Sequence, residues 1–413
     1  MADGRVKIAR RVRQVRNAWH KEGPRWLARR IRHAIAERIK PSVPLQQVLA
    51  ADVLAADLTR PCTPAALPYD GATGAKLNWL MFPPSRGSGG HTTIFRILRH
   101  LEAAGFQNRV YFYDPYRGDH EHYASIVRDV FGFAGPVQSI EEGMIDAHAV
   151  IATSWPTAYA VYSAKSLGQK FYFVQDFEPA FYAASTDSIL AENTYHMGLR
   201  AITAGRWLSH KLRAEYSMVA DHFDFGCDAR QYSVLQGGAA RKGVAFYARP
   251  GASRRAFELG MMTLELLAKR RPEFDLHLYG GKVDGLPFRY INHALVTPPE
   301  LNRIYNLCAA GLTLSLTNVS LVPHEMLAAG CVPVVNDAEH NRMVLDNEVV
   351  RYAPASPHAL AATIEAVMDD PDPQGLSRAA AASVGLRNWD DAGRQVEAIL
   401  YDALWPTGAP SLV

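Results

Sequence analysis

The sequence lacks any run of about 20 apolar residues, so we expect no transmembrane helix. Its basic first residues are not followed by an apolar stretch with a small-residue cleavage site, so we expect no secretory signal. Cysteine is scarce, and no two cysteines have the spacing of a metal site or a redox motif. These absences predict a cytoplasmic protein with free, mostly buried thiols at Cys62, Cys227, Cys308 and Cys331.

Metal-binding patterns are missing as well. The 15 histidines show no metal-ligand spacing. Asp370 and Asp372 flank a proline in a turn, and we interpret that segment as a solvated loop. We therefore predict a protein that has no metal site and that acts without a cofactor.

Charge is distributed unevenly along the chain. The net charge is +3, but residues 1–40 hold 13 lysines and arginines against three acids, which is +10 and leaves −7 for the remainder. Apolar residues that include Trp19 and Trp26 recur there at helical intervals. A basic amphipathic helix fits an anionic membrane surface, so we expect peripheral attachment at the inner face of the cytoplasmic membrane. A solvated helical extension packed on the body is the alternative. No nucleic-acid-reading module accompanies the segment, so we expect no nucleic acid partner.

Beyond residue 75, apolar strands alternate with amphipathic helices, which predicts an α/β fold with parallel sheets. The chain of 413 residues is long enough for two domains. We expect a basic helical extension and linker over 1–75, a first Rossmann-like domain over 76–240, a second over 241–390, and over 391–413 a C-terminal helix that crosses back to the first domain. Among the single elements, we predict a helix at 45–58, a helix at 299–311 and a strand at 312–316.

A glycine-rich loop, SRGSGGHTT at 85–93, follows the first predicted strand. Glycines such as Gly89 and Gly90 let backbone N–H groups close on a phosphate, and the helix start adds its dipole. The loop is not the dinucleotide fingerprint, because Thr92 stands where the third glycine would fall, and it lacks the lysine of a P-loop. A tight turn between strand and helix is the alternative reading.

Arginines follow the first strand of the second domain, in YARPGASRR at 247–255. Ligands of open α/β sheets bind at the ends of strands, and arginines there suit a diphosphate. The alternative is surface arginine at a helix start, which the helix dipole disfavours when no anion is present. In VQDFEP at 174–179, Gln175, Asp176 and Glu178 end another strand and are expected to face a cleft. Capping of a helix or turn is the alternative for these acids.

Residues 315–337, SLTNVSLVPHEMLAAGCVPVVND, predict a polar loop, a short helix and a buried strand. Pro323 suits the first turn of a helix, since its missing N–H costs nothing there. The helix start offers N–H groups and a positive dipole end to an anion, and Glu325 can accept hydrogen bonds from sugar hydroxyls. This combination suits a nucleoside diphosphate that carries a sugar. An ordinary strand-loop-helix unit with a solvated Glu325 is the alternative.

Taken in order, the stretches GSGGH, VQDFEP, FGCD, YARPGASRR and NVSLVPHEMLAAGCVPVV resemble the retaining glycosyltransferases of family 4. The resemblance covers about residues 76–403. It implies the GT-B fold, with two Rossmann-like domains facing a cleft, the first for the acceptor and the second for a nucleotide-sugar donor. The family pattern has two glutamates separated by seven residues. This sequence keeps the second as Glu325 but has Thr317 at the first position.

The QDFEP, YARP and NVSLVPHEM stretches are similar to those of bacterial rhamnosyltransferases that build surface polysaccharides such as O-antigen. This resemblance implies dTDP-L-rhamnose as the donor and a glycan or lipid-linked glycan as the acceptor. Gln175 agrees with that donor. Many family members have a histidine there whose backbone meets the 6-hydroxyl of the sugar, which rhamnose lacks.

The resemblance also implies roles for single residues. Those expected to act in catalysis are Gln175, Asp176, Arg249 and Glu325. Those expected to bind the donor are Gly89, Gly90, Arg249, Arg254, Arg255, Val296, Thr297, Asn318, Val319, Ser320 and Glu325. Within this set the glycines and arginines would meet the diphosphate, Val296 and Thr297 the base, and Glu325 a ribose hydroxyl.

Three alternative functions stay open. A transferase of the same kind could use a UDP or GDP sugar. An oxidoreductase could use the same sheets, although Asp114 is a poor substitute for the acidic residue of a dinucleotide site. A non-catalytic scaffold is compatible with Thr317 in place of the first glutamate.

Overall fold

The computed structural model describes residues 47–63, 65–68, 74–228, 230–236, 240–319, 321–385 and 388–405. The basic extension predicted for residues 1–40 lies outside them and stays a prediction. Of the helix expected over 45–58, the described part forms only α2 (Ala50–Ala55). The helix ends there because the Asp57 carboxylate accepts hydrogen bonds from the Thr59 N–H and hydroxyl and so forms a turn.

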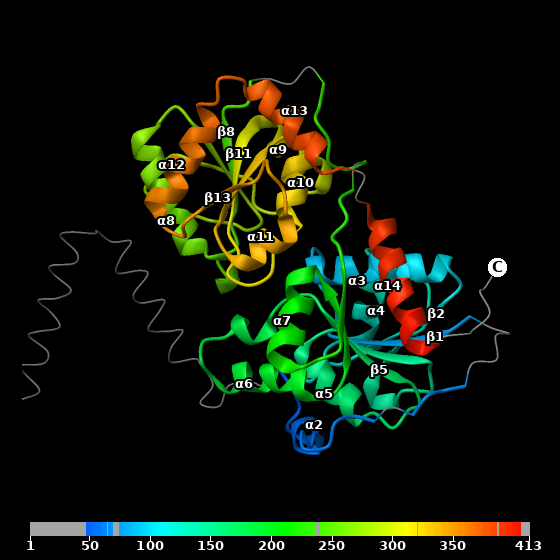
Figure 1. The fold of residues 1–413 in the computed structure, drawn as a ribbon. Helices are drawn as coiled ribbons and strands as arrows, with labels where there is room; N and C mark the ends of the chain where they lie inside the picture. Colours follow the sequence, from blue (N-terminus) through cyan, green and yellow to red (C-terminus); the bar gives the residue numbers. More distant parts are fainter. Residues whose placement is uncertain are drawn as a thin grey trace, which may run out of the picture. The chain divides into compact units, whose positions relative to one another are not determined.

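The first sheet contains seven parallel strands in the order β3-β2-β1-β4-β5-β6-β7 (Figure 1). Its strands are β1 (Lys76–Met81), β2 (Gln107–Phe112), β3 (Val137–Ser139), β4 (Ala149–Ala152), β5 (Gln169–Val174), β6 (Arg200–Ala204) and β7 (Ala220–Phe223). The middle strands β1, β4 and β5 are buried over most of their length. Helices cover both faces of a parallel sheet, which explains their nearly continuous apolar sequences.

Helices and 3-10 turns connect these strands. They are α3 (Gly89–Ala103), α4 (His120–Asp129), η1 (Ile140–Glu142), α5 (Trp155–Ser163), η2 (Glu178–Phe181), α6 (Thr186–Asn193), η3 (Thr194–His196) and α7 (Arg206–Tyr216). The core-facing side of α3 carries Ile94, Ile97, Leu98 and Leu101, the face that the helical spacing predicts.

The second sheet contains six parallel strands in the order β10-β9-β8-β11-β12-β13 (Figure 1). Its strands are β8 (Gly243–Tyr247), β9 (Asp275–Tyr279), β10 (Ile291–Asn292), β11 (Cys308–Thr313), β12 (Val332–Asn336) and β13 (Arg351–Ala353). The connecting elements are η4 (Ser253–Arg255), α8 (Phe257–Arg270), α9 (Pro298–Leu307), α10 (Val322–Ala328), α11 (Glu339–Leu345), α12 (Pro357–Met368) and α13 (Pro373–Ser383).

Both strand orders reverse direction in the middle of the sheet. The chain builds outward from β1 through β2 to β3 and then resumes beside β1 with β4. The second sheet repeats this with β8, β9 and β10, followed by β11. Such reversals define doubly wound domains, whose ligands bind beyond the carboxyl ends of the strands at the reversal. The predicted α/β class with two Rossmann-like domains in the GT-B arrangement is confirmed.

The last helix, α14 (Trp389–Leu404), packs on the first domain against α3 and β7. His100 Nε2 of α3 lies 2.9 Å from Glu397 Oε2, and the rings of Phe106 and Tyr401 meet edge to face. No Cβ would fit at Gly393, because it would lie 2.2 Å from the His100 ring. Glycine therefore allows the two helices to approach closely.

Two sequence-based boundaries are wrong. The segment expected as one helix over 299–311 ends at Leu307, and β11 begins at Cys308, four residues before the predicted strand. The small residues of CAAG favour a helix locally, but pairing with β8 and β12 on both sides makes them strand. In the predicted turn, Pro371 and Asp372 are exposed and Asp370 is partly buried, and Asp372 also caps α13 by accepting from the Gly375 N–H.

The four cysteines are free, and Cys227, Cys308 and Cys331 are buried, as predicted. In the described residues, none of the helices combines the length and the apolar character needed to cross a bilayer.

Candidate active site

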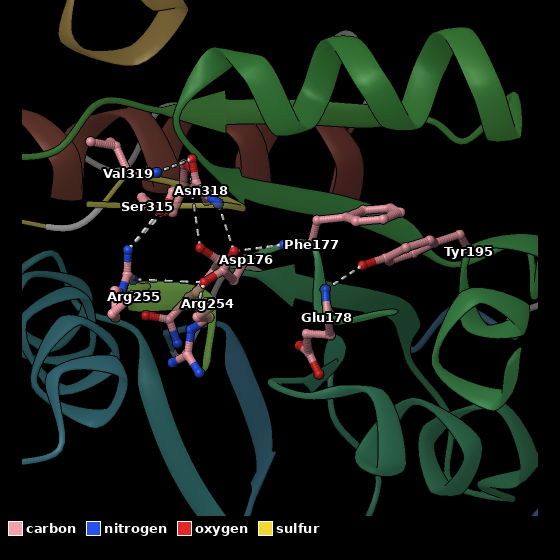
Figure 2. Close-up of polar contacts among 11 residues, drawn as sticks. Asp176, Phe177, Glu178, Tyr195, Arg254, Arg255, Ser315, Asn318 and Val319 are labelled. Atoms are coloured by element: carbon pink, nitrogen blue, oxygen red, sulfur yellow. Dashed lines mark hydrogen bonds and ion pairs between the residues drawn. The ribbon is translucent and has the colours of Figure 1, made fainter. Parts of the chain in front are cut away.

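The candidate site forms where the carboxyl ends of strands from both sheets meet. Gln175 and Asp176 follow β5 of the first sheet, and Arg254 and Arg255 lie in η4 after β8 of the second. The loop 314–319 follows β11. Figure 2 shows the Asp176 side chain turned toward Asn318 and the arginines. The structure thus brings together residues that lie more than 130 positions apart in the sequence.

The Asp176 carboxylate is buried and divides its two oxygens between different partners. Oδ1 accepts the backbone N–H of Phe177 at 2.9 Å and that of Asn318 at 2.8 Å. Oδ2 lies 3.2 Å from Arg254 Nε and 3.8 Å from a terminal nitrogen of Arg255. The carboxylate therefore joins the end of β5 to two segments of the second domain.

Asn318 completes this connection with its side chain. Its Nδ2 donates to the carbonyl oxygen of Gln175 at 3.0 Å and to that of Ala204 at 2.8 Å, and Oδ1 accepts the Val319 N–H. All of its side-chain hydrogen-bonding groups are occupied, and the residue has no exposed surface. Asn318 thus fixes the loop after β11 against the ends of β5 and β6. Its backbone N–H donates to Asp176, and its carbonyl oxygen accepts from Arg255 and Ser315, so the expectation that Asn318 binds the donor stays a prediction.

The three arginines of the YARPGASRR segment have different environments. Arg255 is held by protein partners, because one terminal nitrogen donates to Ser315 Oγ and to the carbonyl oxygen of Asn318. Burial lowers the pKa of Arg255, and Asp176 opposes this effect. Arg254 lies over the Phe181 ring at 4.2 Å, and its Nε makes no hydrogen bond. Among the described residues, no carboxylate pairs with Arg249, which lies 5.9 Å from the Tyr247 ring.

The glycine loop lies beside the end of β5. A Cβ at Gly90 would be 3.4 Å from Gln175 Nε2, whereas one at Gly89 would meet nothing within 4 Å. His91 secures the loop, since its ring nitrogens contact Ser88 Oγ at 2.7 Å and the Phe82 carbonyl at 3.0 Å. The Gln175 side chain therefore lies against Gly90, whereas the neighbouring Gly89 faces open space.

Glu325 lies in the first turn of α10, in an environment that sequence reasoning missed. Burial raises the pKa of Glu325 to about 7, while the charge of Arg96 and a hydrogen bond from Tyr232 oppose the shift. Arg96 belongs to α3 of the first domain and stacks on Trp389 at 4.6 Å. No sequence signal marks Arg96, because it stands between apolar positions of an ordinary amphipathic helix. The electrostatic attraction between Arg96 and Glu325 follows only from the three-dimensional structure.

Glu178, expected to face a cleft, points instead into the first domain, away from Asp176 (Figure 2). Its carboxylate accepts the Trp155 N–H at 2.8 Å and the Tyr172 hydroxyl at 2.9 Å. Burial raises its pKa to about 7 against both hydrogen bonds. Glu178 is a structural anchor, and it holds the segment that carries Asp176.

The remaining predicted donor residues fall outside this cluster. Thr297 caps α9, and both its N–H and its hydroxyl bond to Glu300 Oε2. No contact among the described residues joins Val296 or Thr297 to Asp176. Ser320 lies outside the described residues. The buried hydroxyl of Thr317 has no hydrogen-bond partner in the described part of the chain.

No cluster of three or more His, Cys, Asp or Glu side chains suited to a metal ion occurs within the described ranges.

Comparison with known proteins shows which sequences the chain is similar to. Residues 137–204 match the WsaF N-terminal domain, and residues 242–365 match the WsaF C-terminal domain. The chain is also similar to the O-antigen biosynthesis protein RfbC of Myxococcus xanthus, with 32% identity over 270 residues. That similarity covers 62% of this chain and spans only 21% of the length of RfbC.

Solved structures share the fold at low sequence identity. Sucrose-phosphate synthase from Thermosynechococcus elongatus superposes with a TM-score of 0.61 at 14% identity, covering 81% of this chain and 100% of the synthase chain. Anabaena HepE, solved with UDP and glucose, gives 0.61 at 14% identity, with coverage of 79% and 100%. TarM of S. aureus gives 0.65 at 7% identity, with coverage of 79% and 99%. The chain therefore has the GT-B glycosyltransferase fold and contains segments that match both WsaF domains.

Proposed function

We propose that the protein is a glycosyltransferase that moves a sugar from a nucleotide donor onto a growing cell-surface glycan. The observation that carries this proposal is the meeting of the glycine loop, Gln175 and the basic η4 segment at the strand ends of both sheets. The WsaF matches and the similarity to an O-antigen biosynthesis protein support the same class of reaction.

The donor diphosphate is expected to lie between the glycine loop and the arginines. Gly89 and Gly90 would approach it with their backbone N–H groups, and the open space beside Gly89 supports this approach. Arg249 has no acidic partner among the described residues, and Arg254 has an unbonded Nε. Both suit a doubly charged ligand. Glu325 would accept a ribose hydroxyl, and Val296 and Thr297 would lie near the base.

Transfer with retention would proceed by front-face displacement, without a covalent enzyme intermediate. Negative charge develops on the departing diphosphate, and donors already aimed at it lower the barrier. Gln175 would lie by the reacting carbon of the sugar. We expect no metal to be needed, so transfer should persist in EDTA.

The proposed donor is dTDP-L-rhamnose, and the proposed acceptor is a glycan or lipid-linked glycan. The resemblance to rhamnosyltransferases supports this donor. Gln175 supports it as well, because it replaces a histidine whose backbone, in many family members, contacts a 6-hydroxyl that rhamnose lacks. The basic segment 1–40 would bring the enzyme to the inner face of the cytoplasmic membrane. A UDP sugar is the second candidate, because HepE of the same fold was solved with UDP and UDP-glucose.

A thermal-shift screen against dTDP, UDP, GDP and ADP, with NAD as control, tests the proposal. A ligand at 100 times its dissociation constant adds about 2.7 kcal/mol of stability, which gives a visible shift. Selective stabilisation by dTDP supports the rhamnose donor and leads to turnover assays with dTDP-L-rhamnose. Selective stabilisation by UDP or GDP replaces the donor but keeps the reaction. Stabilisation by none of the nucleotides contradicts the enzyme and favours a non-catalytic scaffold.

A further inference from the structure

We infer that Asp176 is a positioning residue that competes with the donor diphosphate for Arg254 and thereby limits how tightly nucleoside diphosphates are held. This inference rests on the proposed function and assigns Asp176 a role other than contact with the reacting carbon. The feature that carries it is the unequal use of the two carboxylate oxygens.

Oδ1 of Asp176 serves the geometry of the site. It receives two backbone N–H groups, one from its own segment and one from Asn318 across the domain junction. An asparagine oxygen could accept both. Oδ2 makes only ion-pair contacts, because its neighbours are the guanidinium groups of Arg254 and Arg255. The two tasks of the carboxylate can therefore be separated by an isosteric substitution.

Of these two arginines, only Arg254 is free to change partner. The Arg255 side chain is 12% exposed and is tied to Ser315 and Asn318. The Arg254 side chain is 33% exposed, and its Nε lies 3.2 Å from Oδ2 without the geometry of a hydrogen bond. Arg254 also rests on the Phe181 ring, whose face keeps the guanidinium in place when its polar partner changes.

Charge balance gives the direction of the effect. Three arginines and one carboxylate occupy this end of the second sheet and its junction, so the local charge without ligand is positive. A diphosphate brings like charge toward Asp176 Oδ2, and the carboxylate weakens its binding. One unit charge at about 5 Å in a partly buried site changes an anion affinity by about tenfold or more.

The same competition assists product release. After transfer, the nucleoside diphosphate must leave a basic site. The Asp176 carboxylate then replaces the diphosphate as the anionic partner of Arg254. Removing that charge should tighten product binding and slow turnover at saturating substrate. A lower KM together with a lower kcat is the kinetic signature.

The experiment is isothermal titration of UDP and dTDP into wild-type protein, Asp176→Asn, Arg254→Ala and the double variant. We expect Asp176→Asn to bind the preferred nucleotide about tenfold more tightly. The gain should be much smaller in the Arg254→Ala background, since only direct repulsion between the carboxylate and the diphosphate then remains. The matched control is Asp221→Asn, which removes a carboxylate paired with Arg200 at 2.8 Å elsewhere in the first domain. It should leave nucleotide affinity unchanged.

Unchanged or weaker binding by folded Asp176→Asn overturns the inference and leaves Asp176 as a structural bridge only. A gain of undiminished size in the Arg254→Ala background overturns it as well. Failure of the proposed function looks different, because the wild-type protein then binds none of dTDP, UDP, GDP and ADP in the thermal-shift screen, and both proposals fall together.

Discussion

Replacing Glu178 with glutamine should remove a loss of stability that the wild-type protein undergoes as pH rises. Glu178 is 6% exposed, and burial raises its pKa to about 7. Glutamine has the same shape, keeps an oxygen for the Trp155 N–H and presents an amide to Tyr172, but it cannot ionise. The variant therefore removes the titration and keeps the packing.

The sign follows from proton binding in each state. Between pH 4.5 and about 7 the unfolded chain has released this proton while the folded protein still holds it, so the wild-type free energy of unfolding falls as pH rises. Above about pH 7 both states have released the proton, and the free energy of unfolding no longer falls because of Glu178. Each pH unit lowers the free energy of unfolding by about 1.4 kcal/mol, so the whole range from pH 4.5 to about 7 lowers it by about 3 kcal/mol. The difference between Glu178→Gln and wild type should grow by that amount from pH 4.5 to pH 8, in favour of the variant.

Urea unfolding followed by tryptophan fluorescence measures this difference, with both proteins studied at pH 5 and pH 8. Trp155 lies beside Glu178 and reports on the first domain. The control is Glu215→Gln on α7, an exposed carboxylate paired with Lys211, which should change stability by less than about 0.5 kcal/mol at either pH. If Glu178→Gln differs from wild type by the same amount at both pH values, the reasoning from burial is refuted.

Three further predictions concern the site and the extension. Arg249→Ala should reduce transfer by about 10²–10³ with little change in melting temperature, because it removes a donor to the leaving diphosphate; full activity in the variant would remove Arg249 from the site. Burial raises the pKa of Glu325 to about 7, so affinity for the nucleotide sugar should rise by up to about tenfold from pH 6 to pH 8 as its carboxylate forms, and Glu325→Gln should abolish the dependence in calorimetric titrations. A pH-dependent affinity that persists in Glu325→Gln would assign the titration to another group. Deleting residues 1–40 should weaken binding to anionic liposomes in a sedimentation assay, and equal binding would contradict the membrane prediction.

The fold could be predicted well because its signals are local. Buried strands such as β1, β5 and β8 are short apolar runs followed by glycine or polar loops, and these patterns give element type and order. The start of β11 could not be predicted, because Ala309, Ala310 and Gly311 have no intrinsic preference for strand. Their conformation follows from pairing with β8 and β12, which are distant in sequence.

The site shows the same division between local and distant information. Strand ends predict that Gln175, Asp176 and Arg254 lie close together and near a ligand, since such residues gather at one edge of a parallel sheet. The orientation of each side chain depends on its partners. Sequence gives no reason why Glu178 should enter the first domain or why Glu325 should face Arg96 of α3. In sequence, Glu178 and Glu325 are both polar residues near the end of a strand or helix. Their different surroundings follow only from the packing of distant segments.

The return of α14 to the first domain has a mechanical consequence. The backbone passes between the domains twice, once on the way to β8 and once before α14, so the domains are joined at two points. A single tether permits rotation about any axis, whereas two tethers favour bending about the line that connects them. We therefore expect relative movement of the two domains to be a bending motion about these two crossings.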